Sequence, residues 1–205
     1  MEYRRYGMPG TPPVVKNLII INVLMLMAVK LLPIGRLIYA WGALYPVESE
    51  MFHSWQAVSY MFLHADFSHL FFNMFALWMF GRTLEYELGS KRFLTYYMVC
   101  GVGAALIQML VCWLEGSVAS TVGASGAVFG ILLAFGMMHP NNIIMLMFPP
   151  IPLKAKWFVI IYGLIELFAG VSGRMDNVAH FAHLGGMIWG WLLLLYWKKT
   201  GKIFY

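Results

Sequence analysis

The chain has 205 residues, of which 61% are hydrophobic and 11% are charged, and its formal net charge is +5. A soluble domain of this length has about half of its residues apolar and about a quarter charged, so the composition excludes an ordinary soluble protein. The apolar residues gather in runs of about 20 that follow one another without a long polar linker. Such runs predict a polytopic membrane protein, and we expect one transmembrane domain over residues 1–205.

The hydrophobic runs predict an all-α fold of six transmembrane helices, at about 15–33, 60–81, 92–114, 124–139, 155–171 and 178–197. If the N-terminus lies inside, the inside segments hold eleven of the fourteen Lys and Arg residues. The positive-inside rule then holds at every loop, with both termini in the cytoplasm. Because no single face or loop gathers the charge, we expect no nucleic-acid partner.

Two of the expected loops are unusual. The first outside loop, at about 34–58, is long and contains five aromatic residues, Tyr39, Trp41, Tyr45, Phe52 and Trp55. This content predicts a segment associated with the outer membrane interface, and a solvent-exposed loop with scattered aromatics is the alternative. The inside loop 140–153 is apolar but contains four prolines, so it cannot form a further spanning helix.

Polar residues inside the predicted helices meet at one depth. Ser125 and His183 each lie 15 residues above the inside end of their helix, a height of about 22 Å. His69 lies 13 residues above the inside end of its helix, a height of about 20 Å. A hydrocarbon core is about 30 Å thick, so all three lie about 10 Å below the outer face. Ionisable groups are costly at that depth, and each is therefore a candidate functional residue.

The helix expected over 124–139 is short because it begins partway into the membrane. The residues before it, 115–124, must then enter as irregular backbone, which is tolerated only where protein or a water-filled cavity surrounds it. The first N–H groups of this helix have no intrahelical partner. Together with the positive helix end, they favour an oxyanion beside Ser125.

Small residues predict that the fourth and sixth helices pack closely. Each carries a Gly-x-x-x-Gly pair, Gly126 with Gly130 on the fourth and Gly186 with Gly190 on the sixth. His183 lies three residues before Gly186, on nearly the same face, so its imidazole is expected to reach Ser125. A serine hydroxyl needs such a base to become a nucleophile.

The remaining polar residues predict how the site is completed. Asp66 and Asp176 lie too near the outer surface to form a third catalytic member, so we predict a Ser–His dyad. His69 and Asn73 are four residues apart and share a face of the second helix. Two such donors, with the N–H of Ser125, would make an oxyanion hole for a tetrahedral intermediate.

Four motifs now stand in order along the chain. They are His-x-x-x-Asn at His69 and Asn73, the turn "GRTLEYELGSKRF" with Glu85 and Ser90, Gly-x-Ser-Gly at 123–126, and Ala-His-x-x-Gly-x-x-x-Gly at 182–190. Together they resemble rhomboid intramembrane serine proteases in the six-helix bacterial form, nearly end to end.

The resemblance implies an endopeptidase of the bacterial plasma (inner) membrane that cleaves transmembrane protein substrates in the lipid bilayer, without metal or cofactor. It also implies supporting roles in the active site for five residues, Gly123, Gly126, Phe129, Gly186 and Gly190.

The chain departs from the family pattern at two positions. Trp55-Gln56 stands where the family often has Trp-Arg, and Phe129 stands where Tyr is frequent. The Phe129 ring can still pack under His183 without a hydroxyl. We expect Glu166 to form a hydrogen bond within the bundle or to stay protonated.

Two other functions remain open on the sequence. The first is a metal-dependent membrane protein with a zinc site built from His64, His69, His180 and His183. The chain lacks His-Glu-x-x-His, and acidic partners at that depth are not expected. The second is a catalytically inactive relative that binds membrane helices, which the intact dyad argues against.

A substrate that spans the membrane must reach a serine at this depth from the side. We expect the helix over 155–171 to act as the gate, because the proline-rich loop precedes it and the segment Gly170–Gly173 follows it as a hinge.

Overall fold

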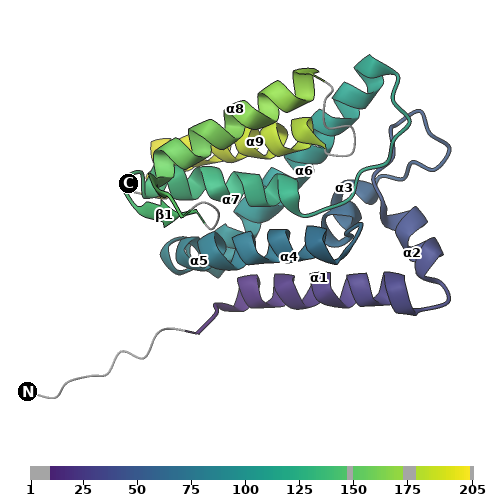
Figure 1. Ribbon diagram of the computed structural model, residues 1–205, viewed down its shortest axis with the longest axis horizontal. Helices are drawn as coiled ribbons and strands as arrows, with labels where there is room; N and C mark the ends of the chain where they lie inside the picture. The colour runs from purple at the N-terminus through teal and green to yellow at the C-terminus, as the bar shows by residue number, and fades with distance from the viewer. Residues whose placement is uncertain (1–9, 147–149, 173–178, 204–205) are drawn as a thin grey trace, which may run out of the picture.

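The computed structural model describes residues 10–146, 150–172 and 179–203 (Figure 1). Gly173 and Asp176 lie outside the described residues. Within them, three helices are long and apolar enough to cross a membrane, namely α1 (Pro13–Leu31), α6 (Ser90–Glu115) and α8 (Ala155–Ser172). The shorter helix α7 (Ser125–Met138) is also apolar, and α9 (His180–Lys199) completes the bundle. The prediction of an all-α polytopic membrane protein is confirmed.

The predicted helix over 60–81 has the wrong bounds. The structure has a continuous helical segment made of α4 (Phe67–Ala76), the π-helical turn η2 (Leu77–Gly81) and α5 (Arg82–Leu88). Before it come the short α3 (Gln56–Ser59) and the 3₁₀ turn η1 (Tyr60–Phe62). The apolar run continues from η1 into α4, so hydropathy does not mark the break in the helix between Phe62 and Phe67.

Asp66 sets the true start of α4. Its carboxylate accepts hydrogen bonds from the backbone N–H of His69, at 2.8 Å, and from Ser68 Oγ, at 2.7 Å. An aspartate in this position satisfies donors that the first helical turn leaves free. The hydrogen bond from the His69 N–H, followed by that from Ser68, lowers the pKa of the Asp66 carboxyl below its usual range.

Glu85 of α5 connects the starts of α1 and α6, at the end of the bundle opposite to Asp66. Its carboxylate accepts hydrogen bonds from the N–H groups of Val14 and Val15, at 2.9 and 2.8 Å, and from Ser90 Oγ, at 2.6 Å. The side chain therefore caps the first turn of α1 while it fixes the turn between α5 and α6. Gly89 makes that turn with a φ of +77°, which favours glycine.

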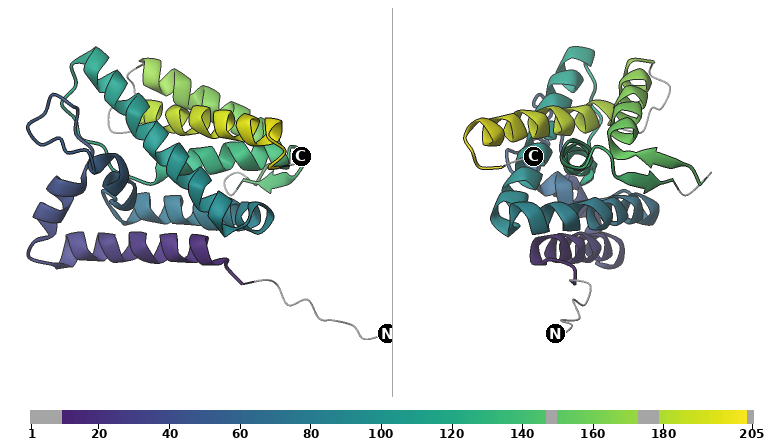
Figure 2. Two further views of the ribbon diagram at one scale, coloured as in Figure 1. Left: turned by 180° about the vertical axis from the view of Figure 1, so that it is seen from behind. Right: turned by 90° about the vertical axis from the view of Figure 1, so that its left-hand side faces the viewer.

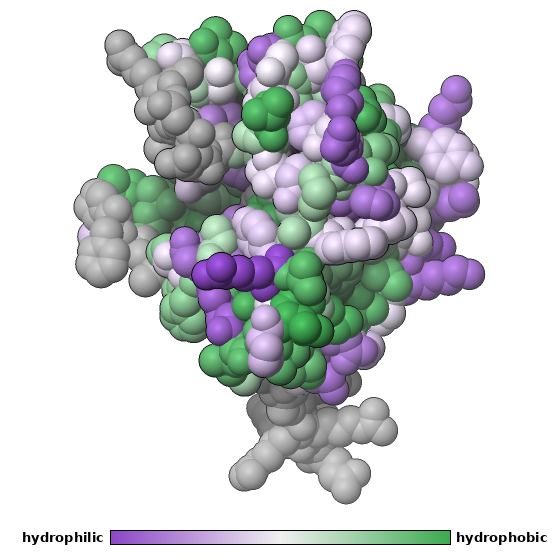
Figure 3. Space-filling view, turned by 90° about the vertical axis from the view of Figure 1, so that its right-hand side faces the viewer, coloured by the Kyte–Doolittle hydropathy of each residue, from purple (hydrophilic) through white to green (hydrophobic). Residues whose placement is uncertain are grey.

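The first loop is partly ordered by stacked rings. It contains α2 (Gly35–Gly42), and the rings of Trp41, His53 and Trp55 stack with centroids 4.2–6.1 Å apart. Viewed from this end, the surface mixes hydrophobic and hydrophilic side chains (Figure 3). Such a mixture suits the predicted position in a membrane interface.

Gln56 fills the place of the family's frequent arginine. Its side chain is fully buried. Its Nε2 donates to the carbonyls of Met51, at 2.8 Å, and Trp41, at 3.3 Å, while its Oε1 accepts from the N–H groups of His53 and Tyr45. One neutral amide thus binds both halves of the loop by four hydrogen bonds.

The segment that leads into α7 is irregular, as predicted, and parts of its backbone form hydrogen bonds with other protein segments. Thr121 exchanges two backbone hydrogen bonds with Leu44 of the first loop, at 2.8 and 2.9 Å. The N–H of Gly123 donates to the carbonyl of Tyr60, at 2.9 Å. Gly123 has a φ of +130°, a conformation that side chains disfavour, so glycine is required here.

Helix α7 is central. The right-hand view of Figure 2 shows it end-on in the middle of the bundle, and the left-hand view shows α6 crossing the bundle diagonally in front. Its contact with α9 is backbone to backbone, because a Cβ at Gly186 would overlap the carbonyl oxygen of Gly126. Tyr96 of α6 donates to the carbonyl of Gly130, at 2.8 Å. The small residues therefore bring the start of α7 against the start of α9.

The proline-containing loop after α7 does not span. Its described residues form a short antiparallel hairpin of β1 (Ile143–Met145) and β2 (Pro152–Lys154). Helix α8 begins directly after this hairpin.

Candidate active site

Ser125 is the first residue of α7, and it contacts a histidine of α9. Its Oγ lies 2.8 Å from His183 Nε2. The other ring nitrogen of His183, Nδ1, lies 2.8 Å from Glu166 Oε2 on α8. Three helices thus supply a continuous hydrogen-bonded series of hydroxyl, imidazole and carboxyl. The depth count anticipated the pairing of Ser125 with His183.

The carboxyl partner was not anticipated. We expected Glu166 to form a hydrogen bond within the bundle or to stay protonated, and we predicted only a Ser–His dyad. The structure has such a hydrogen bond, and its partner is His183. A signal was present, because Glu166 lies 11 residues from the start of α8, about 16 Å up, within roughly one turn of the level of His183. An ionised carboxylate only accepts hydrogen bonds, so it holds the proton of His183 on Nδ1.

Phe129 supports the imidazole from one side. Its ring lies flat against the ring of His183, with centroids 4.2 Å apart and planes at 6°. Phe129 is one turn after Ser125 on α7, so the same helix supplies the hydroxyl and the stacking surface. The ring restricts the imidazole to an orientation that points Nε2 at the serine.

His69 lies against Gly123, close to the serine. A Cβ at Gly123 would lie 2.8 Å from His69 Nε2 and 3.6 Å from Ser125 Oγ, so the ring edge and the hydroxyl border the same backbone. The N–H of Ala65 points at His69 Nδ1, at 3.5 Å. If Nδ1 accepts, the proton of a neutral ring is on Nε2, the nitrogen nearer the serine.

Asn73 shares the face of His69 and is mostly buried. Its Nδ2 donates to the carbonyl of His69, at 2.9 Å. An amide nitrogen carries two hydrogens, so one remains for a substrate oxygen.

The histidines do not form the four-histidine zinc site that the sequence left open. The rings of His64 and His69 contact each other, with centroids 5.0 Å apart. Within the residues that the structure describes, one group of three possible metal ligands forms, and it consists of Glu166, His180 and His183. The acidic partner that we did not expect at that depth is therefore present.

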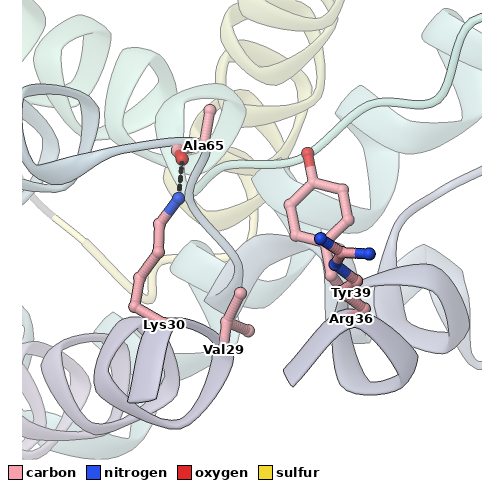
Figure 4. Close-up of a pocket in the computed structure, with 5 residues that line it drawn as sticks. All are labelled: Val29, Lys30, Arg36, Tyr39 and Ala65. Atoms are coloured by element: carbon pink, nitrogen blue, oxygen red, sulfur yellow. Dashed lines mark hydrogen bonds between the residues drawn. The ribbon is translucent and has the colours of Figure 1, made fainter. Parts of the chain in front are cut away.

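A separate cavity lies between α1 and α2. It has a volume of about 510 Å³, and Figure 4 shows the residues that line it, Val29, Lys30, Arg36, Tyr39 and Ala65. Lys30 Nζ donates to the carbonyl of Ala65, at 2.9 Å. None of these residues belongs to the group around Ser125.

The sequence profile of the Rhomboid domain matches residues 52–199, which include every residue of the group around Ser125. This chain belongs to the rhomboid family. The resemblance drawn from the four motifs is confirmed.

Named rhomboid proteins are similar over about two thirds of the chain. The chain is 34% identical over 141 residues to Rhomboid protein 1, mitochondrial, of Saccharomyces cerevisiae, covering 68% of this chain and 40% of that protein. It is 36% identical over 142 residues to RHOMBOID-like protein 5 of Arabidopsis thaliana, covering 69% and 44%. It is 32% identical over 152 residues to Rhomboid protease AarA of Providencia stuartii, covering 68% and 54%. The matched region thus spans about half, or less, of these relatives' lengths.

Proposed function

We propose that this rhomboid protein is an intramembrane serine endopeptidase that cleaves transmembrane substrates within or near the outer part of the bilayer. The observation that carries the proposal is the contact of 2.8 Å between Ser125 Oγ and His183 Nε2. That distance suits a nucleophile and its general base. We further propose a location in a bacterial plasma membrane with both termini in the cytoplasm, which the distribution of basic residues supports.

The chemistry is acyl transfer in two steps. Ser125 Oγ attacks the carbonyl carbon of the scissile peptide while its proton passes to His183 Nε2. The C–N bond then breaks, and the leaving nitrogen takes this proton from the imidazolium. Water hydrolyses the acyl-enzyme in the second step, with His183 again the base and then the acid.

The developing oxyanion needs donors beside Ser125. We assign this role to His69 and Asn73 on α4 and to the N–H of Ser125 at the first turn of α7. The position of His69 against Gly123 supports the first assignment. The free N–H groups and positive end of α7 support the third.

The direct experiment is proteolysis of a single-span membrane protein by the purified chain in liposomes. We expect two fragments from one peptide bond, formed equally well with and without EDTA. A chain that binds the substrate without cutting it would be an inactive membrane-helix binder. Activity that EDTA abolishes would instead support metal-dependent hydrolysis.

His69→Ala and Asn73→Ala are expected to lower kcat by about 10²–10³, the usual effect of losing one oxyanion donor. KM should change little, because these donors act on the transition state. Initial rates at varied substrate density in liposomes measure both constants. Phe72→Ala, on the exposed face of α4, is the matched control and should leave kcat unchanged. An effect on KM alone would assign the two residues to substrate binding.

Glu166→Gln is expected to lower kcat about tenfold. The variant keeps the shape and the accepting oxygen but removes the charge that stabilises the His183 imidazolium, and a hydrogen bond to a charged group contributes about 1–1.5 kcal/mol more than a neutral one. The measurements are kcat, KM and the thermal midpoint, with Glu115→Gln at the exposed end of α6 as the control. A fall in the midpoint without a change in kcat would make Glu166 structural.

A further inference from the structure

Glu166, His180 and His183 form a cluster of three side chains, and the proposed proton transfer uses only Glu166 and His183. Glu166 Oε2 lies 2.6 Å from His180 Nδ1 and 2.8 Å from His183 Nδ1. All three side chains are buried, and their potential ligand atoms lie within 4.8 Å of one another. His180 does not contact Ser125, so proteolysis alone gives this second imidazole no role.

His180 is also incompletely satisfied. The residue is 7% exposed, and its Nε2 has no hydrogen-bond partner among the described residues. A neutral imidazole has one donor and one acceptor nitrogen, so either tautomer leaves one buried polar atom unpaired. No hydrogen bond at Nε2 therefore opposes a small shift of this ring.

We propose that Glu166, His180 and His183 bind a divalent transition-metal ion, with Zn²⁺ the best fit, and that the bound ion inhibits the protease. Two imidazole nitrogens and one carboxylate oxygen are a ligand set that zinc favours, and water can take the fourth position. Tetrahedral ligands at the usual zinc bond lengths are about 3.4 Å apart. The spacings of 2.6 and 2.8 Å would then lengthen by about 0.6–0.8 Å.

Inhibition follows from the position of one proton. Without metal, Nδ1–H of His183 donates to Glu166, and the bare Nε2 accepts the proton of Ser125. An ion on Nδ1 displaces that proton, and a neutral imidazole then carries it on Nε2. The same exchange occurs at His180, so no net proton is released. His183 then donates to Ser125 Oγ and cannot take the serine proton, an effect that rests on the proposed function.

The binding test uses the full-length Ser125→Ala chain, in which proteolysis plays no part. Titration with Co²⁺ should give the visible absorption of a tetrahedral ion at one equivalent, and Zn²⁺ should displace it. His180→Ala and Glu166→Gln in this background should each weaken binding by more than about 100-fold, since even an outer-shell change costs about 10–100-fold. His139→Ala is the matched control, because His139 also pairs with a glutamate, Glu87, at 3.0 Å.

The activity test uses the protein with Ser125 intact. Micromolar Zn²⁺ should reduce cleavage in liposomes, EDTA should restore it, and His180→Ala should remove the sensitivity relative to its own zinc-free rate. Absence of Co²⁺ binding, or equal binding by the His180→Ala and Glu166→Gln chains, overturns the site. If metal binds but the chain with Ser125 intact cuts no substrate, the proposed function and the proposed inhibition are both wrong. The metal site itself is then still supported.

Discussion

Ser125→Ala is expected to abolish covalent labelling by a serine-directed fluorophosphonate and to lower proteolysis by about 10⁴–10⁶. The reason is that Ser125 Oγ is the only nucleophile proposed for the reaction, and its base is 2.8 Å away. Labelling is measured on the purified chain by gel fluorescence, and the modified residue is located by mass spectrometry of peptides.

The control is Ser117→Ala, in the turn after α6, which should label like the unaltered chain. In zinc-free protein, EDTA should leave labelling unchanged, because no metal takes part in the attack. Label that remains in the Ser125→Ala chain would show that another residue reacts, and the proposed nucleophile would be wrong.

His183→Ala is expected to lower kcat by about 10⁴–10⁶, while His180→Ala should retain activity within about tenfold of the unaltered chain. Both imidazoles contact Glu166, but only His183 also contacts Ser125. Fluorophosphonate labelling rates and cleavage rates, measured on chains with equal thermal midpoints, separate the two. The reverse order of effects would make His180 the base.

The sequence predicted much of this site because its signals are periodic or local. Membrane helices have a fixed rise, so counting residues was enough to bring Ser125 and His183 to one depth. The glycine pairs then indicated which faces of their helices meet. Both inferences need only a residue's position along its own helix.

The parts that were missed depend on contacts between segments. The rotation of α8 about its axis decides whether Glu166 meets His183, and hydropathy does not report that rotation. We placed the start of α4 seven residues early because the apolar run hides the break, although an aspartate such as Asp66, whose carboxylate accepts from the N–H of His69, is a helix-start signal. The role of Gln56 needs both halves of a loop folded together.

The carboxylate on α8 bears on how a substrate reaches the serine. We predicted that α8 moves aside as a gate, with a hinge at Gly170–Gly173, but α8 remains helical through Ser172. Moving this helix away from α9 would break two hydrogen bonds to Glu166, each about 1.5–3 kcal/mol when a charged group takes part. Unassisted opening would then be populated in roughly one molecule in 10² to 10⁴.

An open α8 would also leave His183 without the group that holds its proton on Nδ1. A substrate passing beside α8 would thus meet a serine whose base is not yet oriented, and cutting would wait until α8 returned. A membrane protein that contacts the opening only briefly would dissociate before it is cleaved. The time that a segment remains bound, as well as its sequence, would therefore determine what is cleaved.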